Sequence, residues 1–368
     1  MRVSHTAKVA YSKAFAAVFP IIAMMFCIKS VFCMDNCGKM IYNKENTIER
    51  LLDMDNNYNF ISTENINSGI ENNAERFIES SERIYMQQLR TAAEKIYASR
   101  EEKPLVLLSG PSGSGKTTTA LRIALLLGQK GLSVHTLSMD NYFLPADAGE
   151  FPVDEDGKPD LESPYRLDIP MFSEHLEKLS KGEPVDMPVF DFVTQSRSDF
   201  IPVARKSNEI IIIEGIHALN PEVTGDSDDF TTCMYVSVRT RIRTKFGHTL
   251  HPRKIRLMRR LNRDRLFRSR SLEDVFDMFK SVTNGEEKYI MPYKNRATIE
   301  IDSFLPYEAS VYAKMLKSDV ENNREAFAAI EDGDVMLKVL SELEPLSEGL
   351  VPSNSLVREF IGGSSLNY

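Results

Sequence analysis

Short, almost wholly apolar runs alternate with longer amphipathic segments through the middle of the chain. Residues 104–109 and 208–213 read as buried strands, and residues 132–139 are a further strand candidate. Residues 232–238 alternate apolar and polar side chains as a fourth. Segments of helical character separate these runs, which is the order expected when helices connect parallel strands. We therefore predict an α/β fold with one parallel sheet and helices on both of its faces.

The segments on either side of this core have other patterns. Residues 35–73 are rich in Asn, Asp, Glu and Ser, which predicts a linker or poorly ordered arm. From about 74 to 100, apolar residues recur at helical spacing, which predicts a helix that docks ahead of the first strand. Residues 34–100 are thus a linker and docking helix, and residues 316–368 are assigned to a C-terminal helical extension.

The first 33 residues combine a basic start with an apolar stretch. Residues 14–28 would span about 22 Å as a helix, less than the ~30 Å hydrocarbon core of a bilayer. Three interpretations stay open: a targeting or anchor segment, an organellar transit peptide, or a mis-assigned start with Met34 or Met40 as the true first residue. Membrane association is predicted only through residues 14–33.

Composition limits which binding partners and which cellular compartment we expect. The 368 residues are 42% hydrophobic and 27% charged, as in an ordinary globular protein. The net charge of −8 argues against a general binder of nucleic acids or acidic membranes. Cys33 and Cys37 lack a downstream cluster of zinc ligands, and the four cysteines form no disulfide framework. A reducing compartment, most simply the cytoplasm, is predicted for the folded core.

A phosphate-binding motif follows the first predicted strand. Residues 110–117 read GPSGSGKT, the G-x-x-x-x-G-K-[ST] pattern, with a buried strand before them and a helix former after them. Its glycines let backbone N–H groups surround a polyphosphate, Lys116 adds a charge for the outer phosphates, and the Thr117 hydroxyl can bind Mg²⁺. We predict that ATP is bound by Gly110, Ser112, Gly113, Ser114, Gly115, Lys116, Thr117 and Thr118.

Two acidic residues end predicted strands, at the edge of a parallel sheet where ligands bind. Asp140 follows the second strand and is predicted to accept the proton of an acceptor hydroxyl during phosphoryl transfer; a turn cap is the alternative. Glu214 ends the isoleucine run and is predicted to complete a metal site; a solvated strand end is the alternative.

Residues 253–270 are densely basic. Ile255, Met258 and Leu261 recur at a spacing of three, so one stripe is predicted to pack while the other side chains project. In isolation this pattern would indicate a solvated face or an RNA-binding helix. The acidic net charge and the phosphate loop favour a mobile lid over about 248–285, whose arginines clamp the transferring phosphoryl group. The members expected to face inward are Arg260, Arg263, Arg268 and Arg270.

Six segments, in this order, resemble the uridine kinase and phosphoribulokinase group of P-loop kinases: GPSGSGKTT, LSMDNYF, PDLESPYRLD, MPVFDFVTQSR, IIIEGIH and RRLNRDRLFRSR. The resemblance covers about 103–312 and implies a P-loop nucleoside kinase core over residues 101–315. It is finer with bacterial nucleoside kinases related to uridine kinase, through HALNPE, GEEKYIMPY and VPSNSLVREFIGGS. Many of those carry an N-terminal TGS-type domain, which about 100 unrelated-looking residues replace here.

The resemblance implies roles for the catalytic residues. Asp140 would be the base toward a nucleoside 5′-hydroxyl, and Thr117 and Glu214 would hold Mg²⁺. Ser269 stands where a glycine usually separates the two lid arginines. The implied catalytic set is Asp140, Lys116, Arg263 and Arg268.

The resemblance also implies a set of substrate contacts. Glu162 falls where uridine kinases bind the ribose hydroxyls with an Asp, and Arg260 and Arg270 fall at positions that reach the substrate. Phe190 and Gln195 stand where pyrimidine kinases place a Tyr and a His against the base. Phe190 can still stack and Gln195 can still form hydrogen bonds, but the departures leave pyrimidine specificity open.

Together these features predict ATP- and Mg²⁺-dependent phosphorylation of a nucleoside 5′-hydroxyl, with a small nucleoside-like molecule and no nucleic acid as partner. One alternative is a kinase of another small alcohol or phosphosugar. A second is a non-catalytic nucleotide-binding regulator. Homo-oligomers are also open, because relatives assemble through the core.

Overall fold

The computed structural model describes residues 33–34, 40–41, 53–55, 58–149, 151–153, 157 and 159–367. The chain divides into two units, residues 1–51 and residues 52–368. In the first unit, β1 (Cys33–Met34) pairs with β2 (Met40–Ile41) in antiparallel orientation. The basic and apolar segment was predicted over the first 33 residues, and residues 1–32 lie outside the described part. None of the helices that the structure describes combines the length and apolar character needed to cross a membrane.

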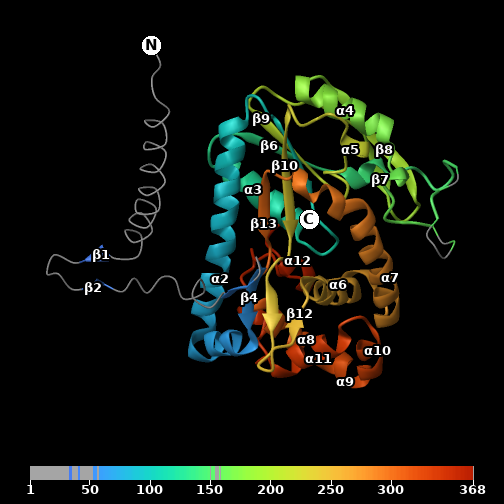
Figure 1. Ribbon diagram of the computed structural model, residues 1–368. Coiled ribbons are helices and arrows are strands. Elements are labelled where there is room, and N and C mark those ends of the chain that lie inside the picture. Colours follow the sequence, from blue (N-terminus) through green and yellow to red (C-terminus); the bar gives the residue numbers. More distant parts are fainter. Residues whose placement is uncertain are drawn as a thin grey trace, which may run out of the picture. The chain divides into compact units, whose positions relative to one another are not determined.

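Five parallel strands form the centre of the larger unit (Figure 1). In sheet order they are β13 (Ile299–Asp302), β10 (Thr231–Ser237), β5 (Leu105–Ser109), β9 (Glu209–Glu214) and β6 (Ser133–Ser138). The four predicted strands, at residues 104–109, 132–139, 208–213 and 232–238, are confirmed as β5, β6, β9 and β10. The edge strand β13 was not predicted, because its sequence IEID is short and alternates apolar and acidic residues.

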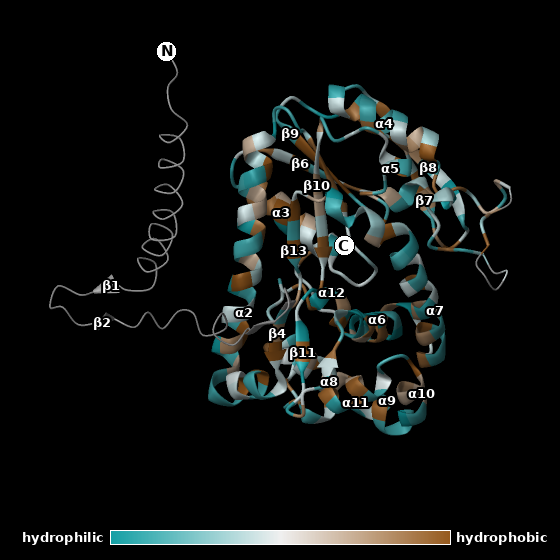
Figure 2. Cartoon of the chain, viewed as in Figure 1, coloured by the Kyte–Doolittle hydropathy of each residue, from teal (hydrophilic) through white to brown (hydrophobic). Residues whose placement is uncertain are grey.

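Helices cover both faces of this sheet, as predicted. Successive strand residues point to opposite faces, and Leu105 and Leu107 of β5 pack in one core cluster with Phe172 and Leu176 of α4 (Ile169–Lys181). The opposite face is covered by α3 (Lys116–Gly128), which packs on β5, β6 and β9. In Figure 2 the strands in the centre are largely hydrophobic, whereas α4 alternates hydrophilic and hydrophobic bands.

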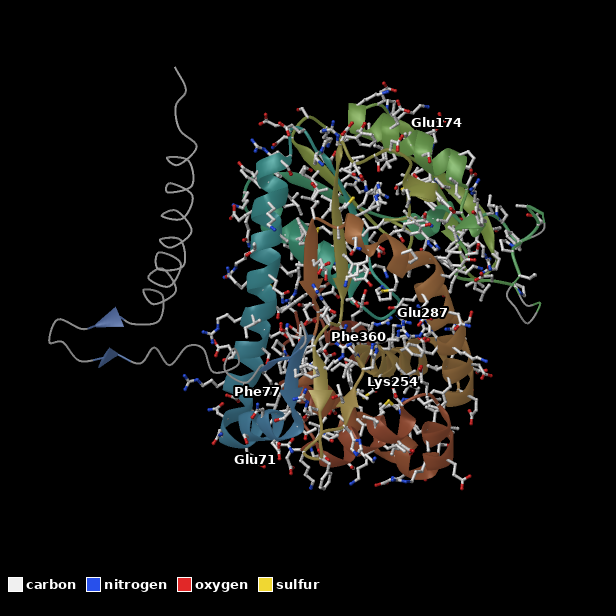
Figure 3. The ribbon with its side chains drawn as sticks, in the orientation of Figure 1. Glu71, Phe77, Glu174, Lys254, Glu287 and Phe360 are labelled. Carbon is white, nitrogen blue, oxygen red and sulfur yellow. The ribbon has the colours of Figure 1, made fainter. Side chains whose placement is uncertain are left out.

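The docking helix is longer than predicted. Helix α2 spans Thr63–Ser99 and kinks at Asn73, whose backbone is extended (φ −171°). At the kink, Phe77 packs so closely on Gly69 that a Cβ at position 69 would lie 2.4 Å from the ring (Figure 3 labels Phe77). The helix over 74–99 is confirmed, but the linker prediction is wrong for residues 58–73, which form β4 (Tyr58–Ser62) and the first turns of α2.

Two smaller sheets complete the β structure. Strand β4 pairs in parallel with β11 (Arg241–Arg243), between β3 (Asp53–Asp55) and β12 (Thr249–Leu250) at the sheet edges. The hairpin of β7 (Val185–Asp191) and β8 (Ser196–Val203) stands beside the main sheet. Its turn, residues 192–195, is exposed and reaches the candidate site described below.

The rest of the chain is mainly helical. In chain order after α5 (Pro221–Thr224) the helices are α6 (Pro252–Arg268), α7 (Leu272–Gly285), α8 (Glu308–Met315), α9 (Lys317–Asn322), α10 (Arg324–Ala329), α11 (Gly333–Glu342) and α12 (Arg358–Ile361). Helices α8 to α11 lie together at one end of the larger unit in Figure 1. The C-terminal stretch predicted as helical therefore contains helices, joined to α12 by an irregular segment.

The prediction that only one stripe of the basic segment packs is wrong. In α6, Arg256 and Arg259 are at most 1% exposed, which is unusual for charged side chains. Glu286, directly after α7, pairs with Arg256, and Glu308, the first residue of α8, pairs with Arg259. These carboxylates come from elements packed against α6, so the first turns of the helix belong to the core. The mobile lid over about 248–285 stays a prediction.

Candidate functional site

The phosphate loop turns between β5 and α3 in the conformation that its glycines allow. Gly113 and Gly115 have φ values of +77° and +84°, which favour glycine. Gly110 is required for a different reason: a Cβ there would lie 2.0 Å from the backbone oxygen of Val236 in β10. Gly110 therefore allows close strand packing, whereas Gly113 and Gly115 shape the loop itself.

Three arginines of α6 hold the loop from behind. Arg256 donates from Nη1 to the Ser112 carbonyl at 3.1 Å, and Arg259 donates from Nη1 to the Gly113 carbonyl at 3.0 Å. Arg260 donates to the Ser112 hydroxyl. The loop carbonyls are thereby directed toward α6, which removes oxygen acceptors from the side where an anion would bind.

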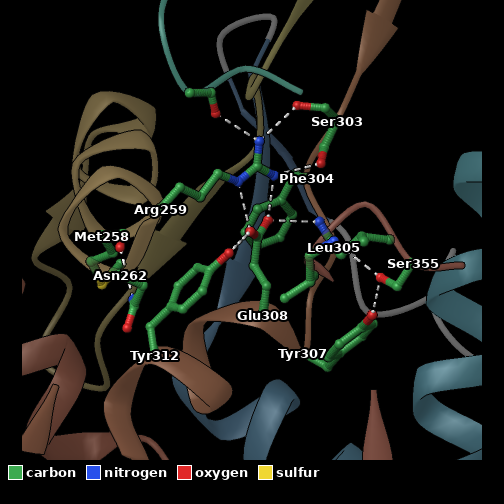
Figure 4. Close-up of polar contacts among 12 residues, drawn as sticks. Met258, Arg259, Asn262, Ser303, Phe304, Leu305, Tyr307, Glu308, Tyr312 and Ser355 are labelled. Atoms are coloured by element: carbon green, nitrogen blue, oxygen red, sulfur yellow. Dashed lines mark hydrogen bonds and ion pairs between the residues drawn. The ribbon is translucent and has the colours of Figure 1, made fainter. Parts of the chain in front are cut away.

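Arg259 is fixed by a closed set of buried polar contacts (Figure 4). Its Nε and Nη2 atoms donate to the two carboxylate oxygens of Glu308 at 2.8 Å each, and the Tyr312 hydroxyl donates to the same carboxylate at 3.0 Å. Nη2 also donates to the Ser303 carbonyl at 2.7 Å. Both charged side chains are 0% exposed. The bidentate pair therefore ties the phosphate loop to α8 through the interior.

A cleft of about 630 Å³ opens in front of the loop, at the carboxyl ends of the sheet strands. Twelve of the predicted site residues line it: Ser112, Gly113, Gly115, Lys116, Thr117, Asp140, Glu162, Gln195, Glu214, Arg263, Arg268 and Arg270. Five others are absent from its lining: Gly110, Ser114, Thr118, Phe190 and Arg260. The structure thus brings most of the predicted residues, from six separate segments of sequence, into one cavity.

Asp140 lies in the turn that follows β6. Burial raises the pKa of its carboxyl group, and the nearby charges of Lys116 and Arg268 oppose that increase. The backbone N–H of Asp140 donates to the Ser138 hydroxyl, so Ser138 rather than Asp140 caps this turn. A carboxylate within the field of Lys116, at the wall of the phosphate cleft, is placed to accept a proton from an acceptor hydroxyl.

Glu214 and Thr117 face each other across the cleft floor, with Oε1 and Oγ1 3.5 Å apart. Burial raises the pKa of Glu214 to about 7, against the lowering effect of Lys116. A hydroxyl and a carboxylate fit Mg²⁺, which takes oxygen ligands and usually keeps several positions for water and phosphate oxygens. Gly215 allows this strand end to pack closely, because a Cβ there would lie 2.6 Å from the Met139 Cβ.

Phe190, the predicted aromatic contact of the base, does not line the cleft. Phe190 is 6% exposed and packs against Phe143 and Phe192, with ring centroids 5.8 and 5.2 Å away. Phe143 and Phe192 line the cleft, and Phe192 is 55% exposed. Phe190 is the penultimate residue of β7 and its side chain points inward, whereas Phe192 begins the turn after the strand. Phe190 therefore supports the aromatic wall from behind.

The arginines at the end of α6 gather around one buried carboxylate. Asp264 is 0% exposed, and its oxygens lie 2.8 Å from Arg263, 3.1 Å from Arg270 and 3.5 Å from Arg268. Ser269, between two of these arginines, has φ +50°, a conformation that favours glycine. Arg260 is 3% exposed, is absent from the cleft lining and donates to the Ser112 hydroxyl. Its contact with the substrate stays a prediction.

Replacing Glu162 by Gln should change stability in a pH-dependent way. Burial raises the pKa of Glu162 from 4.5 to about 7. A carboxyl group with a raised pKa in the folded state stabilises the fold fully below its unfolded pKa and loses this contribution as pH rises through 7. Glu162→Gln should therefore be near neutral at pH 5 and more stable than the parent by about 2 kcal/mol at pH 8.

Urea unfolding at pH 5 and pH 8 measures this difference. The exposed Glu183 provides the control, since Glu183→Gln removes the same charge away from the cleft. An equal effect of Glu162→Gln at both pH values would contradict the assignment of a raised pKa to this carboxyl group.

Several cleft residues were not predicted: Phe143, Leu161, Phe192, Gly215, Ile216 and Glu359. Phe143 and Phe192 stand inside LSMDNYF and MPVFDFVTQSR, two of the segments that carry the family resemblance. Those segments indicated the region of the site but did not single out these two residues. Glu359 stands 241 residues after Thr118, with which it forms a hydrogen bond. Only the tertiary structure brings it to the phosphate loop.

Comparisons with known proteins agree on one family. Residues 105–307 match the family model described as phosphoribulokinase / uridine kinase family. The uridine kinase of Staphylococcus aureus strain JH9 is 32% identical over 198 residues, which are 54% of this chain and 86% of that relative. The uridine kinase of strain Newman gives the same values.

Solved structures with similar backbones are more distant. A possible uridine kinase from Bacillus stearothermophilus has 18% sequence identity and a TM-score of 0.40, over 59% of this chain and 98% of that one. A D-glycerate 3-kinase from Cryptococcus neoformans var. grubii has 13% identity and a TM-score of 0.27, over 69% of this chain and 87% of that one.

Proposed function

Because the chain belongs to the phosphoribulokinase and uridine kinase family, we propose that it transfers the γ-phosphoryl group of ATP to the 5′-hydroxyl of a nucleoside. Membership of this family makes the chain a P-loop phosphotransferase. The nucleoside acceptor is the finer part of the proposal. The observation that carries it is the placement of Asp140 and Lys116 on the walls of one cleft that also has an aromatic wall.

The proposed reaction assigns a role to each wall of the cleft. Asp140 accepts the proton as the acceptor oxygen forms its bond to the γ-phosphorus, and the bond from that phosphorus to the β–γ bridging oxygen breaks to release ADP. Lys116 binds the outer phosphates, and Arg263 and Arg268 neutralise charge that develops on the transferred group. Positioning and charge neutralisation supply most of the rate enhancement in such reactions.

Thr117 and Glu214 are the residues that would hold Mg²⁺. When bound, the ion neutralises phosphate charge and orients the phosphate oxygens. The 3.5 Å separation of their oxygens leaves both groups directed at the same part of the cleft.

A nucleoside fits the acceptor side of the cleft for two reasons. Phe143 and Phe192 offer ring surfaces against which a planar base can stack. Glu162 and Arg270 provide a hydrogen-bond acceptor and donors, which suit ribose hydroxyls and the transferring group. The curated relatives named uridine kinase also support a nucleoside acceptor.

The test is phosphate transfer from Mg·ATP across a panel of nucleosides, sugars, phosphosugars and glycerate. Transfer to one nucleoside above all other acceptors supports the proposal. Transfer to a sugar or glycerate instead would identify another acceptor for the same site. ATP binding without transfer to any acceptor would favour a nucleotide-binding regulator.

Phe192→Ala should raise KM for the nucleoside about 10- to 100-fold and leave KM for ATP near the parent value. Stacking of a base on an aromatic ring contributes about 1–3 kcal/mol, or about 5- to 150-fold in affinity, and the expected change lies within this range. Steady-state kinetics with each substrate varied in turn measures the effect. Val193 is 91% exposed and does not line the cleft, so Val193→Ala is the matched control. A KM unchanged in Phe192→Ala would argue against base stacking at this wall.

A further inference from the structure

The end of the chain returns to the phosphate loop. Residues 351–363, here called the C-terminal strap, include α12 and lie outside the segment that matches the family model. Phe360 of the strap is 0% exposed, with the Arg259 guanidinium 5.0 Å from its ring centroid (Figure 3 labels Phe360). The Ser355 hydroxyl bonds to the Tyr307 hydroxyl at 2.8 Å. The strap is therefore held by buried contacts.

Further contacts tie the strap to the loop and to α3. Leu356 packs on Gly115 so closely that a Cβ there would lie 2.5 Å from Leu356 Cδ1. The Arg122 guanidinium donates to the Asn354 carbonyl. These contacts place the strap directly beside the first turn of α3.

Glu359 extends from the strap into the cleft. Its Oε2 atom accepts a hydrogen bond from the Thr118 hydroxyl at 2.5 Å and one from the Thr118 backbone N–H at 3.4 Å. Thr118 is the third residue of α3, and N–H groups in the first turn of a helix have no partner within the helix. In a phosphate loop these groups form the seat for the phosphates of a nucleotide.

We propose that the Glu359 carboxylate occupies a nucleotide phosphate position at the start of α3, and that ATP binds only by displacing it. Glu359 then lowers the affinity for the phosphate donor, and the C-terminal strap acts on that affinity by holding Glu359 in place. This inference rests on the proposed use of ATP at the phosphate loop. It does not depend on which acceptor is phosphorylated.

The charge of Glu359 favours its displacement by the nucleotide over simultaneous binding of both. Glu359 lines the same cleft as three other acidic side chains, Asp140, Glu162 and Glu214. A phosphate at Thr118 would add further negative charge beside Glu359 and would need the same hydrogen-bond donors. Like charges that share one site do not both remain there without a cost. The Glu359 side chain therefore has to move when a phosphate arrives.

The first measurement is the Kd of ATP by isothermal titration calorimetry, with Mg²⁺ present and no acceptor. Glu359→Gln keeps the size of the side chain, removes its charge and weakens its bond to Thr118. We expect this variant to bind ATP about tenfold more tightly than the parent. Glu359→Asp, whose shorter carboxylate reaches Thr118 less well, should also bind more tightly. Inorganic tripolyphosphate should show the same order, because the competition concerns the phosphate seat.

The matched control is Glu348→Gln, which removes a half-exposed charge that pairs with Lys314 away from the cleft. Its Kd for ATP should equal the parent value. Unchanged or weaker ATP binding by both Glu359 variants would overturn the inference, and weaker binding would instead make Glu359 a ligand for the nucleotide or its metal ion.

The experiments can disprove the proposed function and this inference independently of each other. If ATP binds with the expected order of affinities but no nucleoside is phosphorylated, only the acceptor assignment is lost. If neither the parent nor the Glu359 variants bind ATP or tripolyphosphate, both proposals are overturned.

Discussion

Replacing Asp140 by Asn should lower kcat by about 10²- to 10⁴-fold while the Kd of ATP stays close to the parent value. The amide keeps the shape of the side chain but cannot take the proton of the acceptor hydroxyl. Because burial raises the pKa of Asp140, the neutral Asn should not destabilise the fold. Rapid-quench measurements of product formation, together with ATP titration, separate loss of chemistry from loss of binding.

A matched substitution shows whether the position matters. Asp147 is exposed and absent from the cleft lining, so Asp147→Asn should leave kcat unchanged. A kcat within a few-fold of the parent value in Asp140→Asn would remove Asp140 from the role of base. Loss of ATP binding in the same variant would point to a structural role instead.

Replacing Glu308 by Ala should lower the free energy of unfolding by about 3–5 kcal/mol. The substitution leaves the Arg259 guanidinium buried without its anionic partner, and it removes the acceptor for the Tyr312 hydroxyl. Urea unfolding followed by circular dichroism gives the change. Glu177→Ala is the comparison, because Glu177 pairs with Lys181 on the surface of α4 and should give no measurable change.

A double substitution separates stability from loop geometry. Arg259→Met with Glu308→Leu replaces the pair by apolar side chains, which should recover much of the lost stability. It also removes the hydrogen bond from Arg259 to the Gly113 carbonyl, so its affinity for ATP should be lower than that of the parent. Full recovery of ATP affinity in the double variant would show that Arg259 does not orient the phosphate loop.

Local sequence signals were sufficient for the sheet and for the phosphate loop. The apolar runs of β5 and β9 are local signals, and the glycine pattern of residues 110–117 specifies its own backbone conformation. The positions of Asp140 and Glu214 followed from strand ends, since parallel strands present their carboxyl ends at one edge. These features need no knowledge of distant residues.

Features that depend on distant partners could not be predicted in this way. A helix as basic as α6 reads as exposed, and its burial requires Glu286 and Glu308, which lie 30 and 49 residues from their partners. Residues 58–62 read as a polar arm, yet they form a strand because β11, far along the chain, offers a partner. Whether Phe190 or Phe192 lines the cleft depends on where β7 ends. The alternation of apolar and polar residues does not define that boundary.

Helix α3 is covered by both ends of the folded unit, and this limits how the family segment can be treated. Tyr85 of α2 bonds to Thr119 at 2.7 Å, and Arg122 contacts both Glu82 of α2 and Asn354 of the strap. These partners lie outside the 105–307 match. The shared segment is therefore not a transferable module: grafting it between relatives would require each recipient to rebuild the covering of the nucleotide helix with its own terminal sequences.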